Sequence, residues 1–486
     1  MTAEALTGLV FLPLLAACAV AVLPGRLGGG FVLAGLAPLP LCLIVLTGAV
    51  VDTGTVSLAI AGFASPLGIE WFVDPLALIL LWLNTVIALV VGLYAARDYP
   101  PHSARGGRFW ALWLLLTSAM NALLLSADLF NLFVTLELVT VAAIGLLVID
   151  GKPAALRAGM RYLVLALLGS LFYLLGVALI YGQAGTLDLY QAGERLGPEL
   201  LPVTALVLMT VGLLVKSAVF PLHSWLPAAH GNAPGPVSAV LSAMVVKVSI
   251  YLIWRLWLWL AADWQPDWAL PMLGLLGAGA ILYGSVLAFL QVRLKMMVAY
   301  STVAQLGYLM LLFPLFGPLG FTAATYHLLS HGLAKAAMFL AVSNILAVMG
   351  TDRLDRLGGA DRRLPLDTLT LALAGVSILG LPPSGGFVSK WLMLQAAWAI
   401  EGWVWLIVIL AGGLLAAAYL FRPLAVLCAR PATARPADDV RAPSPAGLRW
   451  GGIVALMLAL AALVAGLAPA PVLTLLEGGL PPGGRP

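Results

Sequence analysis

Residues 212–227 read GLLVKSAVFPLHSWLP, a stretch that places a lysine and a proline within an otherwise apolar run. A lysine near the centre of a membrane helix costs on the order of 2.5–3.5 kcal/mol to insert. Pro221 has no backbone N–H, and its ring clashes with the carbonyl four residues earlier, which predicts a broken helix. Because Lys216 and Pro221 are both expensive in a membrane, we expect both to serve the function of the protein.

The rest of the chain has the same apolar character. Of its 486 residues, 62% are hydrophobic and 9% are charged, and the mean hydropathy is +1.05. Soluble domains carry about 25% charged residues, so the sequence predicts an integral membrane protein. Apolar runs of about 20 residues recur, which predicts an all-α polytopic fold rather than a β-barrel. The first run, residues 6–23, has no basic region before it and is expected to be a span.

Fourteen spans are predicted from these runs. They cover about 3–23, 31–51, 73–95, 109–126, 129–149, 155–182, 200–229, 234–261, 268–290, 295–316, 318–349, 367–400, 403–427 and 449–475. Spans seven and twelve are interrupted by proline. The basic residues support this number: of 25 Lys and Arg, 18 follow odd-numbered spans and one, Arg195, follows an even-numbered span. By the positive-inside rule the odd loops are cytoplasmic, and both termini lie outside.

A weak internal repeat divides the single membrane domain, 1–486. Spans six and eleven have similar sequences, and a proline-broken span follows each of them. We expect N-terminal helices (1–108), a first repeat (109–261), a second repeat (268–427), and a linker and last helix (428–486). Units separated by five helices are inverted relative to each other, and such repeats predict a transport path near the membrane midplane. No function is assigned to the Pro/Ala/Arg-rich linker, 429–449.

Five basic residues lie within the predicted spans: Lys216, Lys247, Arg255, Lys335 and Lys390. Arg255 stands among three tryptophans, so its guanidinium is expected to reach an interfacial aromatic belt. The one clearly intramembrane carboxylate, Glu137, is the natural partner of Lys216, either as a static packing pair or as part of a path. Burial disfavours the charged form of lysine, so some of these lysines are expected to lose and regain protons.

Histidines extend the pattern. His327, His331 and Lys335 occupy positions i, i+4 and i+8 of one helix, so they share a face. This favours a proton relay over satisfied core histidines or a metal site, since no carboxylate or cysteine lies nearby. His223 and His230 flank the first break and are expected to line a water-filled, gating approach, whereas Asp128 is predicted to cap span five.

The two breaks share a chemical consequence. Pro221 follows Lys216, and Pro382 and Pro383 precede Lys390. A carbonyl freed at membrane depth needs water or another polar partner. We therefore expect local hydration beside a lysine at both breaks.

The segments DLFNLFVTLELV, RLKMMVAYSTVAQLGYL, HLLSHGLAKAAMFL and GLPPSGGFVSKW, together with residues 212–253, resemble the antiporter-like membrane subunits shared by complex I, membrane-bound hydrogenases and Mrp-type cation/proton antiporters. The resemblance implies fourteen helices, inverted five-helix repeats (spans 4–8 and 9–13) and a lateral proton path. In that path it implies a Glu137–Lys216 pair, a central Lys247, the relay of His327, His331 and Lys335, and a terminal Lys390.

Within that family, DLFNLFVTLEL and YGQAGTLDL look most like the D-type subunit of Mrp antiporters, whereas PAAHGNAPGPVSA leans toward complex I and hydrogenase relatives. An energy-coupling module for inorganic carbon uptake and a structural scaffold stay open as alternatives. The implied partners are other membrane subunits, including further antiporter-like ones, with protons and sodium as candidate ions in a bacterial-type inner membrane.

Other classes of function find no support in the sequence. Cys18, Cys42 and Cys428 are scattered singly, so we expect no iron–sulfur, zinc or disulfide site. No nucleotide-binding loop occurs, and neither a cofactor nor a nucleic-acid partner is expected. With one intramembrane carboxylate, the chain offers few oxygen ligands for sodium, and we expect any sodium site to lie mainly in partner subunits.

Overall fold

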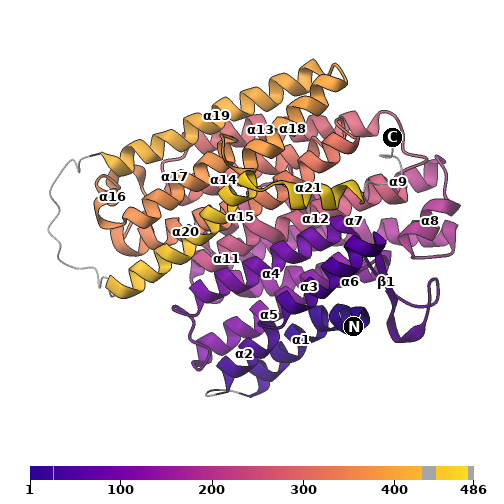
Figure 1. Ribbon diagram of the computed structural model, residues 1–486, viewed down its shortest axis with the longest axis horizontal. Coiled ribbons are helices and arrows are strands. Elements are labelled where there is room, and N and C mark those ends of the chain that lie inside the picture. The colour runs from indigo at the N-terminus through magenta and orange to yellow at the C-terminus, as the bar shows by residue number, and fades with distance from the viewer. Residues whose placement is uncertain (24, 26, 430–444, 480–486) are drawn as a thin grey trace.

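The computed structural model describes residues 1–479 except 24, 26 and 430–444. Most of the predicted linker, with Arg430, Arg435 and Arg441, lies outside the described residues, as do Arg26 and Arg485. The described chain forms an elongated bundle whose helices run mainly along its long axis (Figure 1).

The predicted all-α polytopic membrane fold is confirmed. In the described part of the chain, twelve helical segments are long and apolar enough to cross a membrane. The 17-residue α14 and the pair α17 with α18 account for the other two predicted spans. The spans comprise α1 (Thr2–Val22), α2 (Gly28–Leu36) with α3 (Leu39–Thr53), α4 (Pro75–Ala95), α5 (Ala104–Leu125), α6 (Leu129–Leu147), α7 (Pro153–Ala184), α9 (Leu200–Ser217) with α10 (Leu226–Asn232), α11 (Gly235–Val240) with α12 (Val246–Arg255), α13 (Ala269–Leu290), α14 (Leu294–Met310), α15 (Pro318–Met349), α17 (Pro365–Leu379) with α18 (Gly385–Ala399), α19 (Trp403–Cys428) and α20 (Pro445–Leu467).

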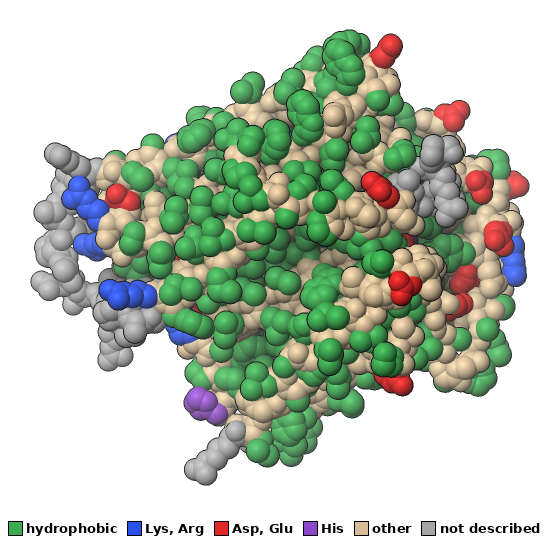
Figure 2. All heavy atoms as spheres, in the orientation of Figure 1, with side chains coloured by type: hydrophobic (Ala, Val, Ile, Leu, Met, Phe, Trp, Pro, Cys, Tyr) green, Lys and Arg blue, Asp and Glu red, His purple; other side chains and the backbone are tan. Residues whose placement is uncertain are grey.

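Several short elements were not predicted. Most of them fall outside the apolar runs, whereas residues 470–475 belong to the predicted last span. A hairpin of β1 (Val56–Ala59) and β2 (Glu70–Val73) joins α3 to α4, with Val56 opposite Val73. The short helices are α8 (Leu189–Arg195), α16 (Ala360–Arg363) and α21 (Ala470–Glu477). In Figure 2, Lys and Arg gather at the end of the bundle near α16, and Asp and Glu gather mainly at the opposite end near α8. We call these the basic end and the acidic end.

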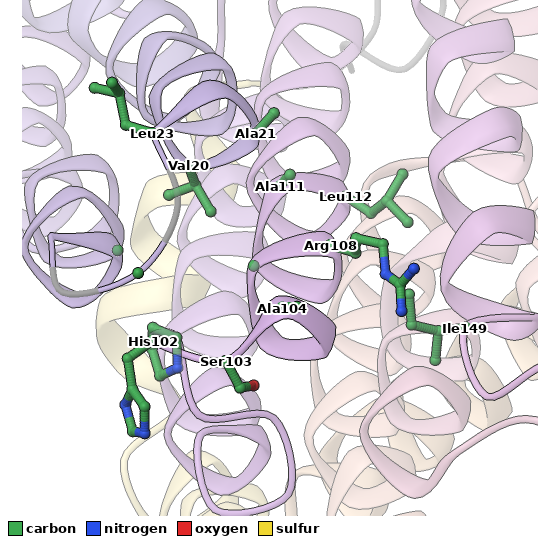
Figure 3. A pocket seen from close by; sticks show the side chains of 14 residues that line it. Val20, Ala21, Leu23, His102, Ser103, Ala104, Arg108, Ala111, Leu112 and Ile149 are labelled. Carbon is green, nitrogen blue, oxygen red and sulfur yellow. The ribbon is translucent and has the colours of Figure 1, made fainter.

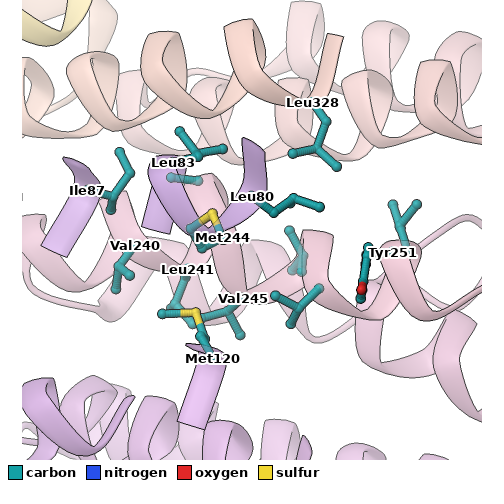
Figure 4. Packing of buried hydrophobic residues seen from close by; sticks show 14 of the residues in the cluster. Leu80, Leu83, Ile87, Met120, Val240, Leu241, Met244, Val245, Tyr251 and Leu328 are labelled. Carbon is teal, nitrogen blue, oxygen red and sulfur yellow. The ribbon is translucent and has the colours of Figure 1, made fainter. Parts of the chain in front are cut away.

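The centre of the bundle is the segment from α11 to the π-helical turn η3 (Leu256–Leu260), which is buried throughout its length. A second π-helical turn, η2 (Leu241–Val245), joins α11 to α12. Leucine and isoleucine side chains of α4 pack on this segment, together with Met120 of α5 and Leu328 of α15 (Figure 4). The span that carries Lys247 is therefore surrounded by protein and does not face lipid.

The two halves of the chain share several features. Helices α7 and α15 both have 32 residues and both end at a glycine in the left-handed region, Gly185 or Gly350. A broken pair follows each helix, α9 with α10 and α17 with α18. A backbone bridge joins Asp128 to Asp188, and a corresponding bridge joins Arg293 to Arg353. These features support the predicted repeat, whose inversion stays a prediction.

The first helix break differs from its predicted form. Helix α9 already ends at Ser217, four residues before Pro221, and Ala218 caps it with φ of 54°. Pro221 therefore lies in the connection to α10 and does not kink a continuous helix. The carbonyl of Val215 accepts a hydrogen bond from the indole of Trp225 at 2.8 Å. The protein itself thus supplies a polar partner for one carbonyl at this break, and the expected hydration beside Lys216 stays a prediction.

Arg255 corrects a second expectation. Its guanidinium is buried inside the protein, with its two Nη atoms 2.6 and 2.7 Å from the carboxylate oxygens of Asp74. The rings of Tyr251 and Trp259 lie 4.9 and 4.4 Å from the guanidinium carbon. Asp74 also caps α4 by accepting from the amide of Ala77. This bidentate pair ties α4 to the central span.

Removing one partner of this pair leaves a buried charge without compensation. We expect Asp74→Ala to lower the free energy of unfolding by about 3–5 kcal/mol. The measurement is denaturant or thermal unfolding of the purified complex in detergent. Asp98→Ala is the control, since Asp98 pairs with its neighbour Arg97 at the protein surface. Equal stability of the two variants would contradict the role given to the Asp74–Arg255 pair.

Candidate functional site

The predicted pair of Glu137 and Lys216 is present. Lys216, in the last turn of α9, is buried, and its Nζ lies 2.7 Å from Glu137 Oε1 and 3.1 Å from Thr140 Oγ1. The hydroxyl of Ser170 on α7 donates to the same carboxylate oxygen. Because a helix C-terminus carries partial negative charge, the end of α9 adds to the attraction that Glu137 exerts on the ammonium.

Two glycines bring α7 and α9 close enough for this arrangement. A Cβ on Gly212 would lie 2.3 Å from the carbonyl oxygen of Gly169, and a Cβ on Gly169 would lie 2.6 Å from that of Gly212. Real side chains do not fit at either position. The contact therefore fixes Ser170, next to Gly169, and Lys216, one turn beyond Gly212, against the same carboxylate.

Lys247 lies on α12 in the central span and is fully buried. Its Nζ donates to the carbonyls of Ser242 at 3.1 Å and Ala243 at 2.8 Å. Both carbonyls belong to the π-helical turn η2, whose widened hydrogen-bonding pattern leaves backbone acceptors for a side chain. The ammonium thus has neutral acceptors and no carboxylate partner.

Helix α14 contacts the groups around both Lys247 and Lys335. The hydroxyl of Ser242, whose carbonyl binds Lys247, lies 3.0 Å from that of Thr302 on α14. Thr302 donates to the carbonyl of Val298 at 3.2 Å, and the same carbonyl accepts from Lys335 Nζ at 2.6 Å, as does the hydroxyl of Ser301. α14 therefore connects the central span to α15 through two hydroxyls and the backbone carbonyls of Ser242 and Val298.

The histidines of α15 form the next part of the site. The rings of His327 and His331 are stacked, with centroids 5.7 Å apart and planes 7° apart. Nδ1 of His327 lies 3.2 Å from the hydroxyl of Ser389, the neighbour of Lys390 on α18. Both histidines are buried. The predicted shared face is thus real, and it points toward the second broken helix.

Lys390 lies where the second break exposes the end of α17. Its Nζ donates to the carbonyls of Ile378 at 2.9 Å and Leu379 at 3.0 Å. The ring of Tyr308 lies 4.6 Å from the same nitrogen. Pro382 lies in the connection between α17 and α18. The lysine itself is thus a polar partner of carbonyls at this break.

The structure places the candidate gating residues at different depths. His223 lies in the first break, where its ring contacts Phe220 and Tyr283 at centroid distances of 5.8 and 5.2 Å. His230 on α10 is fully buried, and its ring stacks on Phe339 at 4.5 Å. Neither histidine is hydrogen-bonded to the lysines of the described chain.

Asp128 caps α6, as predicted, by accepting from the amide of Asn131 at 2.6 Å. Burial raises the pKa of the Asp128 carboxyl, with hydrogen bonds from the backbone opposing the effect. Asp128 lies at the start of α6, more than two turns from Glu137. The structure therefore shows its capping role and no direct contact with the Glu137–Lys216 pair.

Three groups result from these contacts: Glu137 with Lys216, Lys247 with Lys335, and the two histidines with Lys390. No hydrogen bond among the described residues joins Lys216 to Lys247. The sequence had pointed to the ionisable residues but missed the hydroxyls that connect them, at Thr140, Ser170, Ser301, Thr302 and Ser389. Their location on buried faces, one or two turns from an ionisable residue, was the available signal.

A surface groove of about 800 Å³ lies away from these residues, between α1, the start of α2 and α5 (Figure 3). It is lined by apolar side chains such as Val20 and Leu112, with Arg108 and His102 at its edge. None of the buried lysines lines it. The groove therefore does not belong to the candidate site.

Comparison with known proteins decides the family. Residues 126–416 match the family model described as NADH:quinone oxidoreductase/Mrp antiporter, TM. The chain is 35% identical over 368 residues to the N subunit of NADH-quinone oxidoreductase from Desulforudis audaxviator, which covers 75% of this chain and 73% of that one. This chain belongs to the NADH:quinone oxidoreductase/Mrp antiporter family.

Members of this family from both kinds of complex are similar to the chain. The D-type subunit of the Na(+)/H(+) antiporter from Alkalihalophilus pseudofirmus is 28% identical over 394 residues, covering 80% of this chain and 79% of that one. A chain in the solved Mrp complex from Dietzia sp. DQ12-45-1b superposes with a TM-score of 0.88 at 26% identity, covering 99% of this chain and 97% of that one. The chain is therefore an antiporter-like, multi-pass membrane subunit of the Mrp and complex I type.

The contact between His327 and Ser389 generates a prediction. Ser389→Ala removes the hydroxyl that contacts His327 from the neighbouring position to Lys390 on α18, at a cost of about 0.5–1.5 kcal/mol for one hydrogen bond. We expect proton-coupled activity of the assembled complex to fall about three- to tenfold.

The measurement is ion-driven proton movement in membrane vesicles. Thr204→Ala, which removes an exposed hydroxyl of α9 that bonds the carbonyl of Leu200, is the matched loss of one hydroxyl. An unchanged rate in Ser389→Ala would show that this hydroxyl has no part in the site.

Proposed function

We propose that this chain carries protons along a lateral row formed by Glu137, Lys216, Lys247, His327, His331, Lys335 and Lys390. The observation that carries the proposal is the imbalance of buried charge. Of the four buried lysines in the row, only Lys216 has a carboxylate partner within the part of the chain that the structure describes. The other three have carbonyl, hydroxyl or aromatic partners.

This imbalance follows from the physics of burial. An ammonium at membrane depth without a counter-ion carries a large desolvation cost, whereas a neutral amine does not. A carbonyl oxygen stabilises an ammonium by accepting its hydrogen bonds, but it does not take the proton from it. Each of these lysines is therefore poised between a charged form held by its acceptors and a neutral form favoured by burial, as a proton carrier requires.

The Glu137–Lys216 pair gives the row a point of control. When Lys216 is protonated, the ion pair with Glu137 holds the charge at the end of α9. When the pair opens, the ammonium loses its counter-ion and tends to release its proton inward, toward Lys247. His223 and Pro221 in the first break, and Pro382 in the second, are positioned beside the two ends of the row, where access to water is needed.

We propose an Mrp-type Na+/H+ antiporter, with this chain as its D-type subunit, as the parent complex. The support is the superposition with the Mrp chain over nearly the full length of both proteins. A second candidate is a proton-pumping complex of the complex I type, which the higher identity to the N subunit of the oxidoreductase favours. In either case the partners are further membrane subunits, and we place any sodium site mainly among them.

The proposed location is a bacterial-type inner membrane with both termini outside. The support is the distribution of basic residues in the sequence together with the charge separation between the two ends of the bundle (Figure 2).

Removing either member of the ion pair tests the function. Lys216→Ala or Glu137→Ala is expected to abolish proton-coupled activity of the complex while leaving assembly intact. Lys152→Ala, which removes an exposed lysine between α6 and α7, is the matched control and should keep wild-type activity. The readout is sodium-driven or redox-driven proton movement in vesicles, together with co-purification of the partner subunits.

Normal activity in Lys216→Ala or Glu137→Ala would refute the proposed row. The identity of the co-purified subunits separates the two parent complexes: redox subunits would replace the Mrp assignment with the complex I type.

A further inference from the structure

A buried carboxylate that the proposed row does not use lies at the basic end. Asp367 is the third residue of α17 and is 1% exposed. Its Oδ1 accepts from the amide of Asn344 on α15 at 2.7 Å, and the oxygen of that amide accepts from the hydroxyl of Tyr94 on α4 at 2.7 Å. Arg97 donates to the Tyr94 hydroxyl at 3.3 Å. Four side chains from three elements thus join the buried carboxylate to a partly exposed guanidinium.

Helix α20 closes over this cluster through two adjacent glycines. A Cβ on Gly451 would lie 2.7 Å from Arg97 Nη1 and 2.9 Å from Asn344 Oδ1. A Cβ on Gly452 would lie 3.5 Å from Asp367 Oδ2. The last helix therefore fits the polar cluster closely and shields it from lipid, which makes the carboxylate an internal group of the protein.

Buried hydroxyl groups lead from Asp367 toward the second break. Thr370 and Ser377 follow at i+3 and i+10, on the same face of α17, and both are buried. The hydroxyl of Ser377 lies 2.8 Å from that of Ser330 on α15. Ser330 is one turn beyond His327, which contacts Ser389 beside Lys390. A polar row thus runs along the α15–α17 interface from the basic end to the terminal lysine.

An ionisable group inside a membrane protein is costly and is normally retained for a function. We propose that Asp367 is a proton-binding carboxyl that exchanges protons between water at the basic end and Lys390. In the transfer, a protonated Asp367 carboxyl gives its proton through the hydroxyl row to the neutral Lys390 amine, which leaves a carboxylate and an ammonium. Water bridges the two turns between Thr370 and Ser377. This inference rests on the proposed function and adds a route to it.

The charged groups around Asp367 fit such an exchange. Tyr94 of α4 and Arg97 in the turn after α4 face it, and from α15 and α20 it meets a neutral amide and glycine backbone. Helix α20 also carries Arg449, which is exposed. Of the other elements packed on α17, α16 carries Asp361, Arg362 and Arg363, α18 carries Lys390, and α19 carries Arg422. None of these side chains forms a hydrogen bond or ion pair with Asp367 within the described residues. Arg97 favours the carboxylate and burial favours the acid, so both forms are accessible.

Asp367→Asn separates proton binding from structure. Asparagine keeps an oxygen that accepts from Asn344 but cannot carry a proton, so a purely structural role predicts unchanged activity. We expect at least a tenfold lower rate of proton-coupled transport in the assembled complex, with recovery in Asp367→Glu. Asp355→Asn is the control, since it removes an exposed carboxylate at the same end. A wild-type rate in Asp367→Asn would overturn the proposal.

Lys216→Ala is measured in the same vesicles, so that a failure of the Asp367 route can be distinguished from a failure of the proposed row. An inactive Lys216→Ala with a fully active Asp367→Asn would refute only the Asp367 route. A fully active Lys216→Ala would refute the row itself.

A second measurement does not depend on transport. In infrared difference spectra of the complex between low and high pH, we expect a carboxylic acid band that shifts in Asp367→Glu and is absent from Asp367→Asn. If Asp367→Asn does not assemble, the infrared spectra of the wild type and of Asp367→Glu are compared to decide whether Asp367 exchanges a proton. Identical carboxylic acid bands in those two proteins would show that Asp367 does not exchange a proton.

Discussion

An ammonium group inside a membrane must be given acceptors, and this requirement shapes the protein. Three of the four buried lysines of the row lie at a point where the backbone departs from a regular α-helix or where a helix ends, whereas Lys335 lies within α15 and binds Val298 and Ser301 of α14. Lys247 binds carbonyls of a π-helical turn, Lys390 binds the last carbonyls of α17, and Lys216 lies in the last turn of α9 beside Glu137. Among the described residues, only Lys216 has a carboxylate beside it. The charges of the other three lysines are stabilised by carbonyl and hydroxyl dipoles, which do not neutralise them.

The same requirement explains why the helix breaks and the close helix contacts occur together. The break after α17 supplies carbonyls to Lys390, and the glycine contact between α7 and α9 brings Ser170 and Lys216 to one carboxylate. Helix α4 stabilises both halves of this arrangement. At the acidic end it binds Arg255 of the central span through Asp74, and at the basic end it joins the cluster around Asp367 through Tyr94. The polar contacts of α4 thus fix the central span and the second broken helix relative to each other.

Much of this could be predicted from the sequence, because a bilayer imposes length and polarity on every span. The fourteen helical segments, the two breaks and the Glu137–Lys216 pair follow from apolar runs, prolines and the scarcity of buried carboxylates. Arg255 was misplaced because its partner, Asp74, stands 181 positions earlier and reads as a helix cap. Asp367 was missed for a similar reason. It is the third residue of α17, close to the end of the span, and only the packing of α20 shows that it is buried.

The acceptors of the lysines could not be predicted, because backbone carbonyls are invisible in a sequence. A π-helical turn has no residue signature, and a carbonyl freed by proline gives no indication of which side chain binds it. The sequence therefore predicted polar partners for carbonyls at the breaks but not that Lys390 and Trp225 supply them, and the expected hydration beside the lysines stays a prediction. The role of hydroxyl residues such as Ser301 and Ser389 could not be predicted, because it depends on which ionisable group a neighbouring helix brings beside them.

Lys247 tests the central claim most directly, because it is fully buried and its hydrogen-bond acceptors among the described residues are all backbone carbonyls. The decisive measurement is the rate of proton movement by the reconstituted complex carrying Lys247→Met, an apolar side chain of similar length. The account predicts a fully assembled complex that moves no more protons than protein-free vesicles do. Proton movement at the wild-type rate would contradict it.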